Sequence, residues 1–124
     1  MTLRVGILGA GDMGRMHEGI LRADKRVRIV GVADPDPERS RLLAAPSKAK
    51  PLASLEDLFR EKIDVLFITS PNFTHCKAVL AALEKDLHVF SEKPMGLNLD
   101  EGRQILDAVR KSRKIYQLGF NRRF

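Results

Sequence analysis

The chain has 124 residues, of which 44% are hydrophobic, 31% charged and 6% aromatic. This balance indicates one globular domain and excludes the disordered, collagenous and disulfide-rich classes. The formal charge is +6, but residues 1–100 hold 15 basic and 14 acidic side chains, so most of the excess lies in residues 101–124.

Several simple features bear on the compartment. No apolar run approaches the roughly 20 residues of a membrane-spanning helix, and the first residues lack the pattern of a secretory signal. The lone Cys76 excludes an internal disulfide and a thiolate metal cluster. We therefore expect a cytoplasmic protein.

Short β-rich runs alternate with longer helical stretches along the chain. Strands are predicted at residues 3–8, 27–33, 50–53, 64–69, 88–91 and 115–120. Helices are predicted from the glycine turn to about residue 23, at 37–43, from residue 54 onward, at 73–85 and at 99–111. Such alternation indicates a parallel sheet with right-handed crossovers. We expect an α/β fold in three layers, with a doubly wound parallel sheet of order 3-2-1-4-5-6 that fills residues 1–124 as one domain.

A glycine turn joins the first predicted strand to the first predicted helix, which is the context that a dinucleotide-binding fingerprint requires. Gly9 allows the tight turn, Gly11 lets the backbone approach a pyrophosphate, and Gly14 lets helix and strand pack closely. Free N–H groups at the helix start would then face the anion. The residues expected there are Gly9, Gly11, Asp12, Met13 and Gly14.

A carboxylate follows the second strand, where the adenosine ribose of such a cofactor would lie. Asp34 comes 20 residues after Gly14 and can accept hydrogen bonds from ribose hydroxyls. Its charge would repel a 2′-phosphate, so we predict that this Rossmann domain binds NAD(H) in preference to NADP(H). The positive charges of Arg39 and Arg41 could weaken that preference. The alternative is a structural glycine turn with a turn-forming aspartate, and the spacing favours the binding site.

In the order 3-2-1-4-5-6 the direction of the strand order reverses between strands 1 and 4. Polar loops follow strands 4, 5 and 6. They are Ser70-Pro71-Asn72, Glu92-Lys93-Pro94 and Asn121-Arg122-Arg123. Ligands of open α/β sheets bind at the carboxyl ends of the strands, near that reversal. We therefore expect these loops to line one crevice that runs from the pyrophosphate to a reacting centre.

These loops, together with His75 and the closing segment 119–124, resemble the N-terminal domain of the glucose–fructose oxidoreductase/inositol dehydrogenase (Gfo/Idh/MocA) family. The resemblance covers essentially the whole chain. Its most specific part is Glu92-Lys93-Pro94, because that motif lies at the expected distance after a dinucleotide fingerprint. The closing Gly-Phe-Asn-Arg-Arg-Phe is most similar to the inositol dehydrogenase branch.

The resemblance implies contacts with NAD in each loop. The residues that it places at the cofactor are Ser70, Asn72, His75, Glu92, Asn121 and Arg122. Ser70 and Asn72 would contact the phosphate–ribose region, and Glu92 the nicotinamide ribose. Asn121 and Arg122 would border the nicotinamide end or the substrate.

The resemblance also implies the chemistry. Hydride would pass between nicotinamide C4 and a carbinol carbon of a sugar or cyclic polyol. Lys93 would be the catalytic residue, because its ammonium beside the substrate hydroxyl can stabilise developing alkoxide charge. The family usually holds the peptide bond before the motif's proline in the cis form, so Lys93–Pro94 is expected to be cis.

Other polar residues have simpler interpretations. His17 lies on the apolar face of its helix and is predicted to pack, and His88 in a short buried strand is predicted to be structural. Cys76 is interpreted as a small buried residue. His75 could also simply occupy the first turn of its helix. No set of residues has metal-ligand spacing, so no metal is expected.

Two features depart from the family pattern. Asp86 stands where the family has a glycine after a helix, and aspartate tolerates the left-handed conformation better than most residues. The sequence ends at Phe124, whereas family members continue into a second α/β domain. That domain supplies a catalytic histidine, most substrate contacts and the usual homo-oligomer interface. We therefore expect the isolated chain to bind NAD(H) weakly and to turn over little.

Two other functions stay open at this point. One is a stand-alone NAD(H)-binding sensor or partner subunit. Segment 115–120 is expected to end as a strand with no closing element, which favours part of a two-domain oxidoreductase over a stand-alone module. The other is nucleic-acid binding by the basic C-terminal block. It is disfavoured because those charges suit a helix end and lack interleaved aromatic residues. We therefore expect a small-molecule substrate and neither a nucleic acid nor a membrane as partner.

Overall fold

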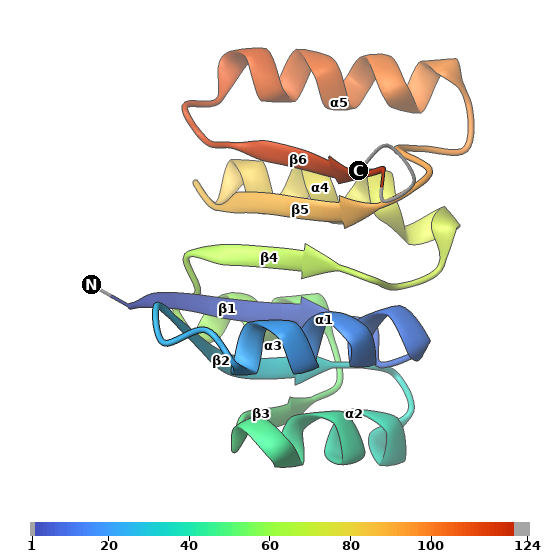
Figure 1. Cartoon of the computed structure of the whole chain (residues 1–124). Helices are drawn as coiled ribbons and strands as arrows, with labels where there is room; N and C mark the ends of the chain where they lie inside the picture. The colour runs from blue at the N-terminus through green and yellow to red at the C-terminus, as the bar shows by residue number, and fades with distance from the viewer. Residues whose placement is uncertain (1, 121–124) are drawn as a thin grey trace.

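The computed structural model describes residues 2–120 as a six-stranded parallel sheet with helices on both faces. The strands are β1 (Leu3–Leu8), β2 (Val27–Ala33), β3 (Lys50–Leu52), β4 (Val65–Ile68), β5 (His88–Glu92) and β6 (Tyr116–Gly119). The helices are α1 (Asp12–Arg22), α2 (Pro37–Ala44), α3 (Leu55–Arg60), α4 (His75–Glu84) and α5 (Leu99–Lys111), with 3₁₀ turns η1 (Ala45–Ser47) and η2 (Asn72–Thr74). The order β3-β2-β1-β4-β5-β6 confirms the predicted topology, and all six strands point the same way (Figure 1).

The middle of the sheet is formed by β1 and β4, which carry buried apolar side chains on both faces. Val5, Ile7, Leu66 and Ile68 are each no more than 1% exposed. Such burial on both faces is typical of parallel strands. The register aligns Leu8 with Ile68, so the two strands end at the same level. The loops that follow them therefore leave the sheet side by side.

Two apolar cores lie on opposite faces of the sheet. One core joins the sheet to α1 and α2, and the other joins it to α3, α4 and α5. Figure 1 shows α1 in front of the strands and α4 behind them. Small side chains bring α4 close to the sheet, since Ala78, Val79 and Ala82 are no more than 2% exposed.

Side-chain caps fix where three of the helices begin. Asp36 accepts a hydrogen bond from the Glu38 amide at the start of α2, and Ser54 accepts one from the Asp57 amide at the start of α3. Asn98 does the same for α5. By contrast, α1 follows Gly11 and α4 follows Thr74, and neither residue provides a side-chain cap. No helix within residues 2–120 is long and apolar enough to cross a membrane.

Asp86 takes the left-handed conformation that the sequence predicts, with φ of +61°. Its amide donates to the Leu83 carbonyl, and the next amide, of Leu87, donates to the Ala82 carbonyl. These two bonds satisfy carbonyl groups in the last turn of α4. The aspartate therefore ends the helix in the way that a glycine would.

The buried thiol of Cys76 gives a first prediction. Cys76 is 6% exposed, and burial raises the pKa of its thiol. Because the thiolate is the nucleophile, we expect native Cys76 at pH 8 to react with Ellman's reagent at least about tenfold more slowly than the same chain in guanidinium. The absorbance of the released thionitrobenzoate measures both rates. Equal rates would contradict this burial.

Candidate functional site

A cleft of about 720 Å³ opens at the carboxyl ends of the strands. It lies where the chain leaves β1, β2, β3 and β4, and its lining includes Gly9, Asp34, Pro35, Leu55, Ser70 and Phe73. The arrowheads of the strands in Figure 1 mark this edge of the sheet. This is the edge at which open α/β sheets bind their ligands.

The glycine turn is held tightly against the ends of β2 and β4. Gly9 has φ of +103°, and its amide donates to the Ala33 carbonyl at 2.8 Å. A Cβ at Gly9 would lie 2.5 Å from the Ser70 nitrogen, and a Cβ at Gly14 would clash with the Gly9 carbonyl. Both positions therefore require glycine, as the sequence predicts.

Gly11 is different, because the space beside it is open. A Cβ built there meets no protein atom of the described chain within 4 Å. Gly11 is also the N-cap residue just before α1, so among residues 2–120 no side chain accepts a hydrogen bond from the Asp12 or Met13 amide at the helix start. An anion can approach this helix end without displacing protein atoms.

Asp34 fixes the other side of the glycine turn. It is only 8% exposed, and its Oδ2 accepts a hydrogen bond from the Ala10 amide at 2.9 Å. Its Oδ1 accepts one from the Asp36 amide, also at 2.9 Å. Each carboxylate oxygen can accept more than one hydrogen bond. The group is therefore held in place and can still receive the hydroxyls of a ligand.

A second cleft, of about 760 Å³, separates α1 from α2. Its lining includes Gly11, Arg15, Arg22 and Arg39, and Arg39 also borders the first cleft. The nearest carboxylate oxygen to the Arg39 guanidinium is that of Asp36, at 3.9 Å. Arg39 is thus the cation of α2 that lies closest to both clefts.

The loop after β4 carries Ser70 and Asn72 to the same edge. Thr69 donates from its hydroxyl to the Gly9 carbonyl at 2.8 Å, which ties this loop to the glycine turn. The Ser70 hydroxyl lies 2.5 Å from that of Thr74. Asn72 is exposed and begins η2. Ser70 therefore lines the cleft, whereas Asn72 belongs to the same loop but is not among the residues that line it.

His75 lies at the start of α4, where its ring contacts the backbone of two loops. It is 1% exposed, and its two ring nitrogens lie 2.8 Å from the Pro94 carbonyl and 2.9 Å from the Ser70 carbonyl. Both nitrogens thus have backbone partners. In this structure, His75 joins the loop after β4 to the loop after β5.

The Glu92-Lys93-Pro94 motif begins at the last residue of β5 and has the expected cis bond between Lys93 and Pro94. Lys93 is exposed, and within residues 2–120 it forms no ion pair, so its ammonium is available to a ligand. Asn121 and Arg122, the last two residues predicted at the cofactor, lie outside the described residues.

Sequence reasoning missed one residue of this edge. His17 does pack on the apolar side of α1 as predicted, but its Nε2 also lies 2.5 Å from Oε1 of Glu92. The signal in the sequence was the position of His17, one helical turn after Gly14. That signal does not reveal a partner 75 residues away.

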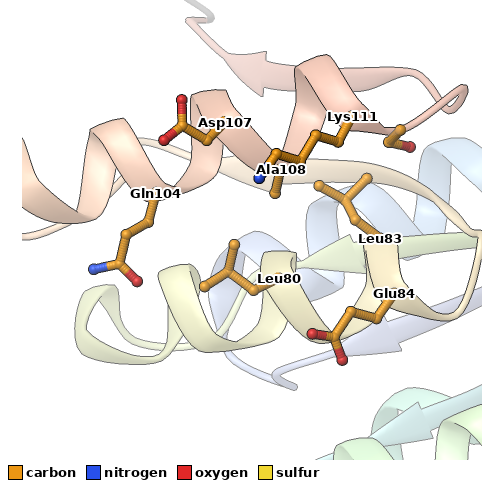
Figure 2. A pocket seen from close by; sticks show the side chains of 8 residues that line it. Leu80, Leu83, Glu84, Gln104, Asp107, Ala108 and Lys111 are labelled. Atoms are coloured by element: carbon orange, nitrogen blue, oxygen red, sulfur yellow. The ribbon is translucent and has the colours of Figure 1, made fainter.

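A third hollow, of about 490 Å³, lies between α4 and α5, away from this edge (Figure 2). It is lined by the second half of α4 and by α5 from Gln104 onward, including Leu80, Leu83 and Ala108. Because both helices run back from the carboxyl edge, this hollow lies toward the amino end of the sheet. Among the described residues, no three His, Cys, Asp or Glu side chains gather as a metal site.

Comparison with known proteins gives a consistent result. Residues 3–120 match the Gfo/Idh/MocA family model, described as an oxidoreductase family with an NAD-binding Rossmann fold. The chain is 36% identical over 125 residues to inositol 2-dehydrogenase of Rubrobacter xylanophilus, and 31% identical over 121 residues to glucose-6-phosphate 3-dehydrogenase of Bacillus subtilis. These matches cover 98% of the chain but only 36% and 34% of the relatives.

A solved structure shows the same relation. The chain superposes on scyllo-inositol dehydrogenase from Lactobacillus casei, crystallised with NAD(H) and scyllo-inositol, with a TM-score of 0.92 and 26% identity. The match covers 100% of this chain and 38% of that one. The chain therefore spans little more than a third of the length of the proteins that it matches.

The contrast between Gly9 and Gly11 gives a second prediction. Gly9→Ala should lower the free energy of unfolding by roughly 2–4 kcal/mol, because it combines a disfavoured φ with a clash against Ser70. Gly11→Ala, with φ of −88° and open space, should change it by less than about 1 kcal/mol. Urea denaturation followed by circular dichroism measures both. If Gly11→Ala lowered the free energy of unfolding as much as Gly9→Ala does, the space beside Gly11 would not be open.

Proposed function

The chain belongs to the Gfo/Idh/MocA family of oxidoreductases, and from this membership we propose that it is the NAD(H)-binding part of an enzyme that transfers hydride between nicotinamide and a carbinol carbon of a sugar or cyclic polyol. The observation that carries the proposal is the open helix end at Gly11 beside the fixed carboxylate of Asp34. The inositol and sugar-phosphate dehydrogenases among its relatives support the substrate class.

The residues present fit a dinucleotide at the glycine turn. The missing Cβ of Gly11 leaves room for a phosphate, and the start of α1 presents the amides of Asp12 and Met13 with the positive end of the helix dipole. Gly9 and Gly14 hold the turn against its neighbours. We assign the pyrophosphate to this helix end.

Asp34 would hold the adenosine ribose. Its carboxylate is already oriented by the Ala10 and Asp36 amides, so no ordering of the side chain is needed when hydroxyls bind. The adjoining cleft, with Pro35, Leu55 and Phe73 in its lining, would receive the adenine ring. The negative charge of Asp34 would repel a 2′-phosphate, and the positive charge of Arg39, which lines the same cleft, would offset part of that repulsion.

The loops after β4 and β5 would serve the reacting end. Ser70, Asn72 and Glu92 would contact the phosphate, ribose and nicotinamide portions, and we propose the same region for Asn121 and Arg122. When NAD⁺ is bound, its nicotinamide accepts the hydride. Lys93 would place its unpaired ammonium beside the reacting oxygen and stabilise the negative charge that develops there.

The remaining parts of the active site would come from outside these 124 residues. We propose a second domain that provides the base for the hydroxyl proton, most of the substrate contacts and a homo-oligomer interface. The share of the relatives that the chain covers supports this division. We also propose a cytoplasmic location and a small-molecule substrate, with no nucleic acid as partner.

Binding of reduced cofactors to the chain tests the cofactor proposal. We expect NADH to bind at least about tenfold more tightly than NADPH, because Asp34 repels the 2′-phosphate. Asp34→Asn keeps the shape but removes the charge, so the ratio of the two dissociation constants should fall toward one. Nicotinamide fluorescence titration measures all four constants.

Gly11→Ala is the matched control for this experiment. It should weaken NADH and NADPH alike, because the added methyl group fills the phosphate cradle and leaves Asp34 untouched. Tighter binding of NADPH than of NADH by the unchanged chain would overturn the assignment of Asp34. Failure of the chain to bind either cofactor would overturn the proposed function.

The native mass of the protein tests the second-domain proposal. An antibody against this domain should detect a band roughly two to three times heavier than 13.9 kDa in the source cells. That ratio follows from the 36–38% of the relatives that the chain covers. A single band at 13.9 kDa would contradict the second domain and favour the NAD(H) sensor or partner subunit.

A further inference from the structure

A contact between His17 and Glu92 joins the glycine-turn helix to the end of β5. The Nε2 atom of His17 lies 2.5 Å from Oε1 of Glu92, and the two side chains are only 14% and 13% exposed. Hydrogen bonds to a charged group are stronger than those between neutral groups, especially where water is largely excluded. The contact therefore restrains the Glu92 carboxylate more than a surface ion pair would.

An aromatic seat holds the His17 ring in this orientation. Phe67 of β4 and Phe90 of β5 stack on each other with centroids 4.8 Å apart. The His17 ring meets both of them edge-on, at 5.5 Å and 5.0 Å between centroids. These arrangements are among those that aromatic pairs prefer. The seat thus directs Nε2 toward Glu92 and limits rotation of the ring.

The second oxygen of Glu92 lies against the last residue of β6. A Cβ at Gly119 would come within 3.3 Å of Oε2 and 2.9 Å of the Phe90 ring, so only glycine leaves the carboxylate its present room. Within residues 2–120, Oε2 receives no hydrogen bond. One oxygen of Glu92 is therefore held by His17, and the other is free to accept a hydrogen bond from a ligand.

From this geometry we infer that His17 is a positioning residue, which holds Glu92 so that its free oxygen receives a hydroxyl of the nicotinamide-side ribose. The inference rests on the proposed function, which assigns Glu92 to that ribose. His17 donates to Glu92 either as the neutral Nε2–H tautomer or as the imidazolium. Its effect should be confined to the nicotinamide half, because Asp34 and Gly11 hold the adenosine and pyrophosphate portions.

Two ligands separate this role from a purely structural one. NADH carries the nicotinamide-side ribose, whereas ADP carries only the adenosine half and its phosphates. His17→Phe keeps an aromatic ring between Phe67 and Phe90 but removes the donor to Glu92. We expect it to weaken NADH binding by about tenfold, which matches the loss of one charge-assisted hydrogen bond, and to change ADP binding by less than about twofold.

His17→Gln provides the matched rescue, because its amide can donate to Glu92 in place of Nε2. NADH affinity within about threefold of the unchanged chain is expected for this variant. In a Glu92→Ala background, His17→Phe should cause no further loss of NADH affinity, since the residue it positions is gone. Calorimetric or fluorescence titration of the 124-residue chain provides each dissociation constant.

Each outcome decides the question. Equal losses for NADH and ADP would show that His17 only supports the fold, and an unchanged NADH affinity would show that Glu92 does not need it; either result overturns the inference. If His17→Phe does not fold, the ¹⁵N NMR chemical shifts of the His17 ring, measured in the unchanged chain, provide the test instead. They should move on addition of NADH and not of ADP, and equal movement overturns the inference. An unchanged chain that binds ADP but not NADH, or neither, overturns the proposed function itself.

Discussion

The bond from the Ala10 amide to the Asp34 carboxylate connects the two segments on which the site depends. It joins the loop after β1 to the end of β2, next to the bond from the Gly9 amide to the Ala33 carbonyl. Because Asp34 is almost buried, an unpaired carboxylate at this position would be costly. The same hydrogen bond therefore shapes the glycine turn and orients the one carboxylate expected at the adenosine ribose.

Side chains then link this turn to the later loops of the same edge. Thr69 ties the loop after β4 to Gly9, and His75 ties that loop to the Pro94 carbonyl after β5. His17 reaches Glu92 directly from α1. The loops after β1, β4 and β5, which are neighbours in the sheet, are therefore restrained by one another. Precise placement of a flexible dinucleotide requires such restraint.

The alternation of strands and helices predicted the fold and its strand order, and short spacings predicted the glycine turn with Asp34. The helix predicted at 73–85 is shorter in the structure, because residues 72–74 form the 3₁₀ turn η2 before α4 begins at His75. The partners of His75 and His17 could not be predicted in this way. Those contacts join residues 19 and 75 positions apart and exist only because β5 lies beside β4 in a particular register. A histidine on an apolar helix face predicts packing equally well with or without a carboxylate opposite it.

The uncapped start of α1 has a thermodynamic consequence. Side-chain caps satisfy first amides of α2, α3 and α5, whereas α1 and α4 have no such cap within the described part of the chain. At α1 the proposed dinucleotide would take that role. A ligand that binds only the folded chain adds to its stability in proportion to the logarithm of its concentration above the dissociation constant. Resistance to unfolding and to proteolysis would then rise and fall with the supply of dinucleotide, so that the cellular level of cofactor would influence how long the protein persists.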